Sequence, residues 1–175
     1  MDDIVIRSML KWPDVPDVYG WLQLDRRGNW RIRDASPGAK PLFEPIGNTA
    51  LREFIARNYS ADNRGCWFFQ NGPQRVFVTL AYAPFAFRLE NGVFADQCGR
   101  VVRRPDKAWL DEEGSLVLSA AGSVGLMDDR DLGAVAETLA EGVFGTGADS
   151  VPVGRLASGE VEARFGFVRD PKPDE

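Results

Sequence analysis

The chain has 175 residues, of which 44% are hydrophobic and 11% aromatic, so it can bury a sizeable core and is not disordered as a whole. Its formal net charge of −5 argues against nucleic acid or an anionic membrane as its partner, because both attract basic surfaces. The sequence contains no histidine, which excludes imidazole general bases, Ser-His and Cys-His dyads and imidazole metal ligands.

The charge is unevenly distributed along the chain. Residues 1–104 carry 15 Lys and Arg against 11 Asp and Glu, whereas residues 105–175 carry 6 against 15. We interpret this asymmetry as complementary surfaces that pack together within the chain or guide the formation of a homodimer. The alternative interpretation is an anion-binding site on the basic first part.

Two features of the sequence bear on location. The first four residues, Met1 to Ile4, do not resemble a secretory signal, and no apolar run approaches the roughly 18 residues that a membrane helix needs. Cys66 and Cys98 are too few to form a disulfide framework. We therefore expect a cytoplasmic protein with two reduced thiols, in which Cys66 packs as a small hydrophobic residue.

The first predicted elements are an extended arm and a hairpin. Two prolines exclude a helix interior from residues 12–19. Residues 21–25 and 28–33 alternate apolar and polar side chains around an Arg-Gly pair, which is typical of a tight β-hairpin. A loop that contains proline and glycine is expected over residues 36–47.

A helix and two further hairpins follow. Asn48 or Thr49 is predicted to cap a helix that is ended by the polar segment 60–65. Four apolar side chains lie on one face of this helix: Leu51, Phe54, Ile55 and Tyr59. Residues 66–70 and 74–81 are expected to form two strands joined by Asn71-Gly72-Pro73. The later strands are expected over residues 85–90 and 93–94, joined by Asn91-Gly92, which is a strong hairpin signal.

A second copy of this arrangement is predicted from Trp109 onward. Asp128 or Asp129 caps a helix whose apolar face carries Leu132, Val135 and Leu139, and a glycine at position 142 ends it. A glycine-rich loop follows over residues 145–148. The last strand is expected over residues 164–168, and residues 169–175 are interpreted as a solvated tail.

The sequence predicts an α+β fold of two related halves, each an antiparallel hairpin or sheet with one amphipathic helix. The relation is based on five aligned positions around two Asp-x-x-Gly turns: Leu24 with Leu110, Asp25 with Asp111, Gly28 with Gly114, Trp30 with Leu116 and Ile32 with Leu118. We expect a first half over residues 1–104, a second and shorter half over residues 105–168 that packs on the first, and a tail over residues 169–175.

Two segments resemble a family of uncharacterised proteobacterial proteins. One is the run from Lys11 to Asp34, with Lys-Trp-Pro, Tyr-Gly-Trp-Leu and Leu-Asp-x-x-Gly-x-Trp. The other is Phe54-Ile55-x-Arg57-Asn58-Tyr59 with the following stretch from Gly65 to Val76. The layout is also similar to a second bacterial family of unknown function, in which two related α+β halves pack together and a signalling or ligand-binding role is suspected. These resemblances imply an intracellular binding module and supply no catalytic residue.

The best candidate for a binding site is the hairpin from Trp67 to Arg75. It combines aromatic stacking surfaces with amide and guanidinium donors, which suits a small anionic or aromatic ligand or a protein partner. The candidate binding residues are Trp67, Phe69, Gln70, Asn71, Gln74 and Arg75. The alternative is a core hairpin with a polar tip, because aromatic residues in strands usually pack in the core.

The leading functional hypothesis is a non-enzymatic cytoplasmic binding or regulatory module, with no cofactor and no metal. The alternative is an enzyme that uses carboxylate, arginine and tyrosine groups without histidine or zinc, and its candidate residues are Asp25, Asp111, Arg75 and Tyr82. However, aspartates at matched turns commonly accept hydrogen bonds from the amides of their own turn. The acidic run 128–131 is interpreted as a helix start, where negative charge is favourable.

Overall fold

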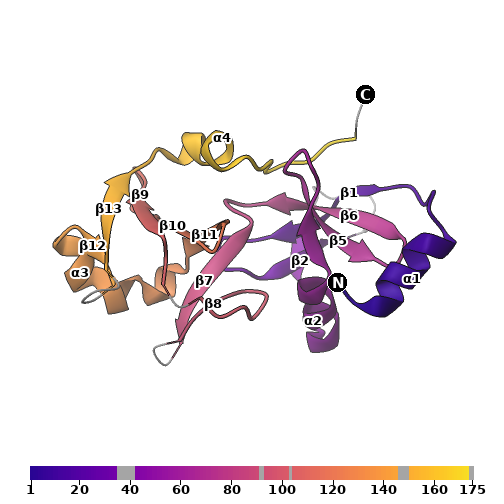
Figure 1. Cartoon of the computed structure of the whole chain (residues 1–175), viewed down its shortest axis with the longest axis horizontal. Coiled ribbons are helices and arrows are strands. Elements are labelled where there is room, and N and C mark those ends of the chain that lie inside the picture. The colour runs from indigo at the N-terminus through magenta and orange to yellow at the C-terminus, as the bar shows by residue number, and fades with distance from the viewer. Residues whose placement is uncertain (35–41, 91–92, 103, 146–149, 174–175) are drawn as a thin grey trace. The chain divides into compact units, whose positions relative to one another are not determined.

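The protein has an α+β fold with two β-sheets and a few helices, as the sequence predicts (Figure 1). The structure is a computed structural model, and it describes residues 1–34, 42–90, 93–102, 104–145 and 150–173. The Asn91-Gly92 turn, residues 36–41 of the predicted loop over residues 36–47 and residues 146–148 of the predicted loop over residues 145–148 lie outside the described residues.

The chain divides into two compact units. Unit 1 comprises Met1–Asp25, Asn29–Ala81 and the residues from Gly166 on, and unit 2 comprises Arg26–Gly28 and Tyr82–Phe165. The sequence placed the division at residue 104 instead. The difference arises because the strands formed by residues 85–96 pair with the second sheet and not with the first.

Unit 1 contains a sheet of strand order β3-β2-β1-β6-β5-β4. In chain order its strands are β1 (Val18–Leu24), β2 (Trp30–Arg33), β3 (Phe43–Pro45), β4 (Tyr59–Ala61), β5 (Trp67–Asn71) and β6 (Gln74–Leu80). Neighbouring strands are antiparallel except for β1 and β6, which are parallel. The predicted hairpins β1–β2 and β5–β6 are confirmed, whereas β3 forms inside the segment that was predicted to be a loop.

Two helices belong to unit 1, α1 (Asp3–Lys11) and α2 (Thr49–Arg57). The α2 helix was predicted: Asn48 caps it by accepting a hydrogen bond of 3.0 Å from the backbone N–H of Leu51. It lies against the sheet beside β5 (Figure 1), where the Phe54 ring meets the edge of Phe69 at a centroid distance of 5.4 Å. The α1 helix was not predicted.

The opposite face of the same strands carries a second apolar cluster, formed by buried Cys66, Phe68 and Phe77 with Tyr19 and Val168 packed against them. The Tyr19 and Phe77 rings stack in parallel at 4.5 Å, and Cys66 pairs with Val168 in a parallel bridge. Phe167 and Val168 are therefore part of the core of unit 1. The predicted solvated tail begins with a residue that contacts the sheet, because the carbonyl of residue 169 accepts a hydrogen bond of 2.7 Å from the Leu80 N–H of β6.

Unit 2 contains a sheet of strand order β12-β13-β9-β10-β11-β7-β8. In chain order its strands are β7 (Phe85–Glu90), β8 (Val93–Asp96), β9 (Lys107–Leu110), β10 (Leu116–Ala120), β11 (Ser123–Met127), β12 (Val143–Phe144) and β13 (Val151–Arg155). Its helical segments are the 3₁₀ helix η1 (Asp129–Val135), α3 (Ala136–Ala140), the 3₁₀ turn η3 (Ser158–Glu160) and α4 (Val161–Phe165). The hairpins β7–β8 and β9–β10 match the prediction.

Two predicted elements of unit 2 differ from the structure. The predicted strand 164–168 is wrong, because residues up to Phe165 belong to α4 and Gly166 then ends the helix with a φ of +65°. The predicted helix after Asp128 is present as a 3₁₀ turn followed by five α-helical residues. Asp128 caps it as expected, since its Oδ1 accepts the N–H of Arg130 at 3.0 Å.

The two sheets share a pattern of strand pairing. The order β3-β2-β1-β6-β5 in unit 1 and the order β11-β10-β9-β13-β12 in unit 2 both read antiparallel, antiparallel, parallel and antiparallel. In both units a helical segment comes directly after the strand that begins this order: α2 follows β3, and η1 follows β11. The two Asp-x-x-Gly turns also agree, because Gly28 and Gly114 both have a φ of +79°.

Candidate functional site

Unit 1 contains a groove of about 660 Å³ that we name the arm groove. Three segments line it: the end of α1, the arm that follows it and the β5–β6 hairpin. The lining residues are Met9, Leu10, Trp12, Pro13, Val15, Pro16, Asp17, Gln70, Pro73 and Arg75. The groove therefore combines seven apolar side chains with three polar ones.

The register of the β5–β6 hairpin brings two of these polar side chains together. Gln70 lies directly opposite Arg75, two positions from the pair Phe68 and Phe77. Because side chains alternate between the faces of a strand, all four share one face of the sheet. This is the face that carries the apolar cluster around Cys66, so the groove lies at one end of that cluster.

Gln70 has a buried side chain with one unmet hydrogen-bonding requirement. Only 1% of the residue is exposed. Its Nε2 donates to the carbonyl oxygen of Gly72 at 2.9 Å, and since a carbonyl can only accept, this contact fixes the orientation of the amide. Among the described residues, the Oε1 atom then has no hydrogen-bond partner. A buried acceptor without a partner costs about 1–3 kcal/mol and calls for a physical explanation.

Arg75 is held beside Gln70 by stacking and not by a carboxylate. Its guanidinium carbon lies 4.8 Å from the centroid of the Phe68 ring. Asp17 lines the same groove, yet within the described part of the chain neither Arg75 nor Asp17 makes an ion pair. The groove thus presents two opposite charges that do not neutralise each other.

The arm is positioned by hydrogen bonds to the hairpin. The Gln74 amide donates to the carbonyl oxygen of Pro16 at 3.0 Å, and Val18 at the start of β1 pairs with Val76 of β6. The apolar side chains at the rim remain accessible, since Leu10 is 81% and Trp12 52% exposed. A ligand can therefore bury apolar surface here without displacing the core.

The remaining predicted site residues lie elsewhere on the hairpin. Phe69 is buried against α2, and the Trp67 ring packs at 4.8 Å from Tyr59, so both face away from the groove. Asn71 is exposed, and Gln74 holds the arm. Of the six candidates, the groove is lined by Gln70 and Arg75; their role in binding remains a prediction.

The residues of α1 and of the arm that line the groove were not predicted. The sequence contains a signal for them, because Leu10 and Trp12 are large apolar residues beside a proline-rich segment that cannot be helical. The distance of about 55 residues between the arm and the hairpin in the sequence hides their proximity.

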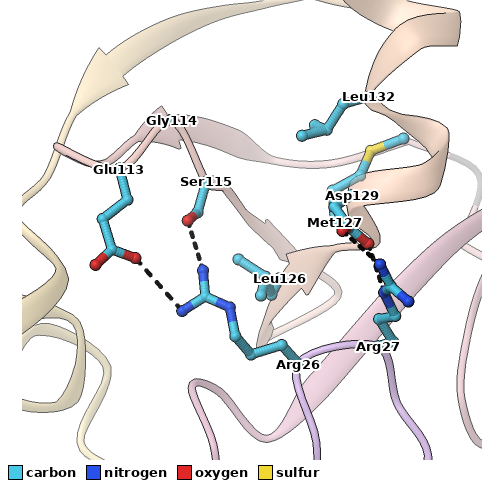
Figure 2. A pocket seen from close by; sticks show the side chains of 9 residues that line it. All are labelled: Arg26, Arg27, Glu113, Gly114, Ser115, Leu126, Met127, Asp129 and Leu132. Atoms are coloured by element: carbon cyan, nitrogen blue, oxygen red, sulfur yellow. Dashed lines mark hydrogen bonds and ion pairs between the residues drawn. The ribbon is translucent and has the colours of Figure 1, made fainter.

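A second and smaller pocket, of about 300 Å³, lies in unit 2 (Figure 2). The Arg26 guanidinium donates to Ser115 Oγ at 2.7 Å and lies 3.7 Å from the Glu113 carboxylate. Arg27 donates to both carboxylate oxygens of Asp129, each at 2.8 Å. The hydrogen bond from Arg27 lowers the pKa of Asp129 to about 2. Each charged side chain that lines this pocket already has a partner within it, so the pocket is stabilised as it stands.

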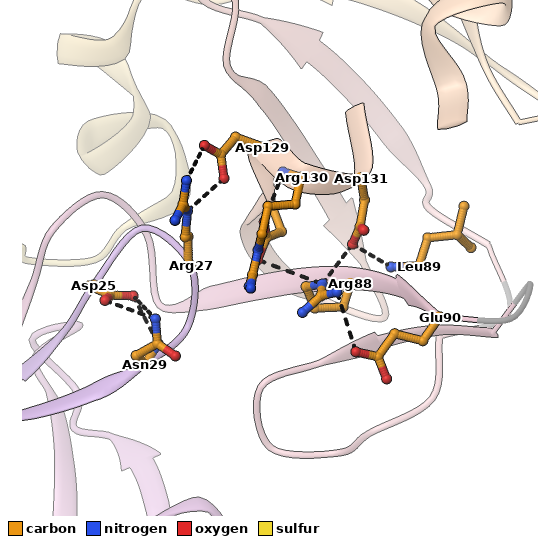
Figure 3. A network of polar contacts seen from close by, with 10 residues as sticks. Asp25, Arg27, Asn29, Arg88, Leu89, Glu90, Asp129, Arg130 and Asp131 are labelled. Carbon is orange, nitrogen blue, oxygen red and sulfur yellow. Dashed lines mark hydrogen bonds and ion pairs between the residues drawn. The ribbon is translucent and has the colours of Figure 1, made fainter. Parts of the chain in front are cut away.

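The acidic start of η1 belongs to an extended ionic network (Figure 3). Arg88 contacts Asp131 at 2.7 Å, Glu90 at 3.4 Å and Asp128 at 3.6 Å. Partial burial raises the pKa of Asp131, but the hydrogen bonds from Arg88 and from the Leu89 N–H outweigh it, so the net shift is downward. Among the residues that the structure describes, no group of three or more Cys, Asp or Glu is arranged to hold a metal ion.

Two of the candidate residues for the enzyme hypothesis, Asp25 and Asp111, stabilise turns, and Arg75 lines the arm groove. Asp25 accepts the Asn29 N–H at 2.9 Å. Asp111 accepts the Ser115 N–H at 2.7 Å through Oδ1 and the Tyr82 hydroxyl at 2.8 Å through Oδ2. Tyr82 and Asp111 are buried, with 2% and 3% exposed, and neither lines the pocket of unit 2.

Neither cysteine is in an environment that favours reaction. Cys66 is buried in the apolar cluster, as expected from the sequence. Burial, together with the nearby Asp96 carboxylate, raises the pKa of Cys98 to about 12, so this thiol is protonated at neutral pH. In the described part of the chain, no helix has the length and apolar character needed to cross a membrane.

Comparison with solved structures identifies the fold. A DUF1285 family protein from Silicibacter pomeroyi DSS-3 superposes with a TM-score of 0.50 at 14% sequence identity, over 85% of this chain and 87% of that chain. A DUF1285 family protein from Shewanella baltica OS155 gives a TM-score of 0.43 at 13% identity, over 66% of this chain and 90% of that chain. The first shows a shared fold and no more, and the second is too distant to support an argument.

No curated protein is detectably similar to the chain. The family DUF2944, described as "Protein of unknown function (DUF2946)", matches residues 1–172. This match covers both sheets, the arm groove and the pocket of unit 2, and it agrees with the resemblance to uncharacterised proteins noted from the sequence. The chain therefore belongs to this family of unknown function.

Proposed function

We propose that the protein is a non-enzymatic binding module whose arm groove holds a small ligand with an anionic group. The observation that carries this proposal is the unpartnered Oε1 of Gln70, in a residue that lines the groove and is 99% inaccessible. A ligand N–H or O–H that donates to Oε1 would remove the cost of leaving this acceptor unpaired.

The surroundings of Gln70 define the rest of the ligand. Arg75 lies directly opposite Gln70 and has no carboxylate partner among the described residues. An anionic group of the ligand can therefore accept hydrogen bonds from both donor edges of its guanidinium. The apolar wall suits a hydrophobic portion, and the volume lies in the usual range for small-molecule sites. The predicted ligand therefore carries a donor beside an anion, attached to an apolar body.

Binding is favoured over catalysis by the kind of groups that line the groove. They are an amide, a guanidinium and one carboxylate, and this set lacks a second titratable group that could exchange protons with Asp17. In unit 2, the acceptors of Asp111 are used by its own turn and by Tyr82. The enzyme alternative thus has less support than the binding module.

Thermal denaturation with added ligand tests the proposal. Hippurate and indole-3-lactate both place a donor beside a carboxylate on an aromatic body, and adenosine monophosphate supplies a phosphate instead. A ligand that binds the native state raises Tm by mass action, by an amount equivalent to about 2.7 kcal/mol at 100 times its Kd. We expect a rise with at least one of the first two probes.

Two variants make the test specific. Gln70→Leu removes the acceptor and Arg75→Ala the cation, and each should abolish the rise in Tm. Because Arg75 has no ion-pair partner among the described residues, its removal leaves no carboxylate unpaired. The free energy of unfolding of the unliganded Arg75→Ala protein should therefore fall by about 1 kcal/mol or less. Asn71→Ala, at an exposed neighbouring position, is the matched control and should bind normally. Equal binding by all three variants would overturn the proposal.

The other expectations from the sequence remain proposals. A cytoplasmic location is supported by Cys66 and Cys98, which form no disulfide within the described part of the chain, and cell fractionation would check it. An internal repeat is supported by the matching strand order of the two sheets and by the two Asp-x-x-Gly turns. Homodimerisation, or a protein in place of the small ligand, would be recognised by sedimentation analysis.

A further inference from the structure

We infer that the ligand of the arm groove is a free α-amino acid with a large apolar side chain, bound as the zwitterion. This inference rests on the binding function proposed above and names the chemical class of the ligand. Three observations carry it: two opposite charges in one groove that form no ion pair with any described residue, a buried acceptor that lines the same groove, and an accessible apolar rim.

The first observation is the pair of charges. Arg75 and Asp17 both line the groove, and neither forms an ion pair with a described residue, including each other. A ligand with a single negative charge would satisfy Arg75 and leave the Asp17 carboxylate as a repulsive neighbour. A zwitterion satisfies both, because its carboxylate meets the guanidinium and its ammonium meets the aspartate.

The second observation is the need of Gln70 for a donor. Its Oε1 accepts and cannot donate, and an ammonium group offers three N–H donors. One donor can reach Gln70 and another Asp17. Gln70 and Arg75 are directly opposed on antiparallel strands, so their Cα atoms are about 4.5–5.5 Å apart. An ammonium and a carboxylate joined through one carbon have the short separation that this pair of side chains requires.

The third observation is the apolar rim. Leu10 and Trp12 are largely exposed, and Met9, Pro13 and Pro73 complete the wall. Burying an exposed apolar side chain against this wall stabilises a complex in proportion to the area removed from water. An aromatic ligand side chain can also stack on the Trp12 ring. A small amino acid would leave this apolar wall uncovered.

Isothermal titration calorimetry with four related probes tests this inference. L-phenylalanine has both charges; L-phenylalanine amide lacks the carboxylate, 3-phenylpropionate lacks the ammonium, and N-acetyl-L-phenylalanine replaces the ammonium with a neutral N–H. We expect L-phenylalanine to bind at least about tenfold more tightly than each of the other three, since a hydrogen bond to a charged group is worth more than a neutral one.

Charge-removing variants assign each contact. Asp17→Asn should weaken the binding of L-phenylalanine by about tenfold or more and should not weaken that of 3-phenylpropionate, because it removes a carboxylate that repels this anion. Arg75→Ala should weaken the binding of both. Asp14→Asn removes an exposed carboxylate from the same arm that does not line the groove, and it should change neither.

The outcomes separate this inference from the binding function itself. If 3-phenylpropionate or N-acetyl-L-phenylalanine binds as tightly as L-phenylalanine and depends on Arg75, the amino acid class is wrong and the anion-binding groove stands. If L-phenylalanine binds to Asp17→Asn and to Arg75→Ala with the same affinity as to the wild type, the inference is overturned. If no probe binds, the inference is also overturned, and the hippurate, indole-3-lactate and nucleotide experiment decides the proposed function on its own.

Discussion

Replacement of Gly65 by alanine should be among the most damaging small changes in unit 1. A Cβ atom at this position would lie 2.1 Å from the carbonyl oxygen of Gly166 and 2.9 Å from the Cα of Phe167. Both are backbone atoms, so the clash cannot be relieved by a change of rotamer. Gly65 also has a φ of +79°, which costs a residue with a side chain about 1–2 kcal/mol.

The magnitude follows from what the clash displaces. To make room, residues 166–168 must move away, which breaks the hydrogen bond of 3.0 Å from the Val168 N–H to the Gly65 carbonyl and loosens the cover over the Cys66 cluster. Loss of that hydrogen bond adds about 1 kcal/mol, and overpacking adds about 1–3 kcal/mol. We therefore expect Gly65→Ala to lower the free energy of unfolding by about 3–6 kcal/mol.

Gly20→Ala provides the matched control within unit 1. Gly20 has a φ of +71° and would place its Cβ with nothing within 4 Å, so it isolates the conformational cost of about 1–2 kcal/mol. Urea denaturation followed by circular dichroism gives both values. Equal losses of stability for the two variants would show that Gly166 does not approach Gly65 closely, and the reasoning would be refuted.

Two further predictions concern buried and partly buried polar groups. Tyr82→Phe should lower the free energy of unfolding by about 1–3 kcal/mol, because it leaves Asp111 Oδ2 without its donor in a buried site; no loss in urea denaturation would contradict the buried contact. For Asp62, burial raises the pKa, but hydrogen bonds from the Cys66 N–H and from Arg64 outweigh it and hold the pKa below its usual 3.8. The contribution of Asp62 to the free energy of unfolding should be complete above about pH 4 and fall as the pH drops through the lowered native pKa. In denaturation curves recorded across pH, Asp62→Asn should therefore lose less stability below about pH 4 than the wild type.

Local signals in the sequence predicted the elements that depend on a few adjacent residues. The β1–β2 and β9–β10 hairpins were found because aspartate and glycine fix a tight turn, and here each aspartate indeed accepts a hydrogen bond from an amide of its own turn. The α2 helix was found because Asn48 is a strong cap. Gln70 and Arg75 entered the candidate site for a similar reason, since both flank one predicted turn.

Elements that depend on distant contacts could not be read in this way. Phe165 and Phe167 alternate with small or polar residues like a strand, but an alternation of five residues is also compatible with a helix end, and α4 is the result. The parallel pairing of β1 with β6 joins segments about 50 residues apart in the chain, and no local pattern reports it. The arm side of the groove was missed because its proximity to Gln70 depends on that pairing.

The pairing of Val168 with Cys66 also sets an order of events during synthesis. Unit 1 is assembled from sequence on both sides of unit 2, and its Cys66 cluster is covered only when residues 166–168 reach it. On the ribosome, most of unit 2 emerges before those residues and can collapse first, since domains fold as units while the chain grows. Until then, the apolar surface around Phe68 and Phe77 in the first 81 residues remains uncovered. In this period they offer apolar strand surface to chaperones or to other nascent chains, which makes the interval before residue 168 appears the step most exposed to aggregation.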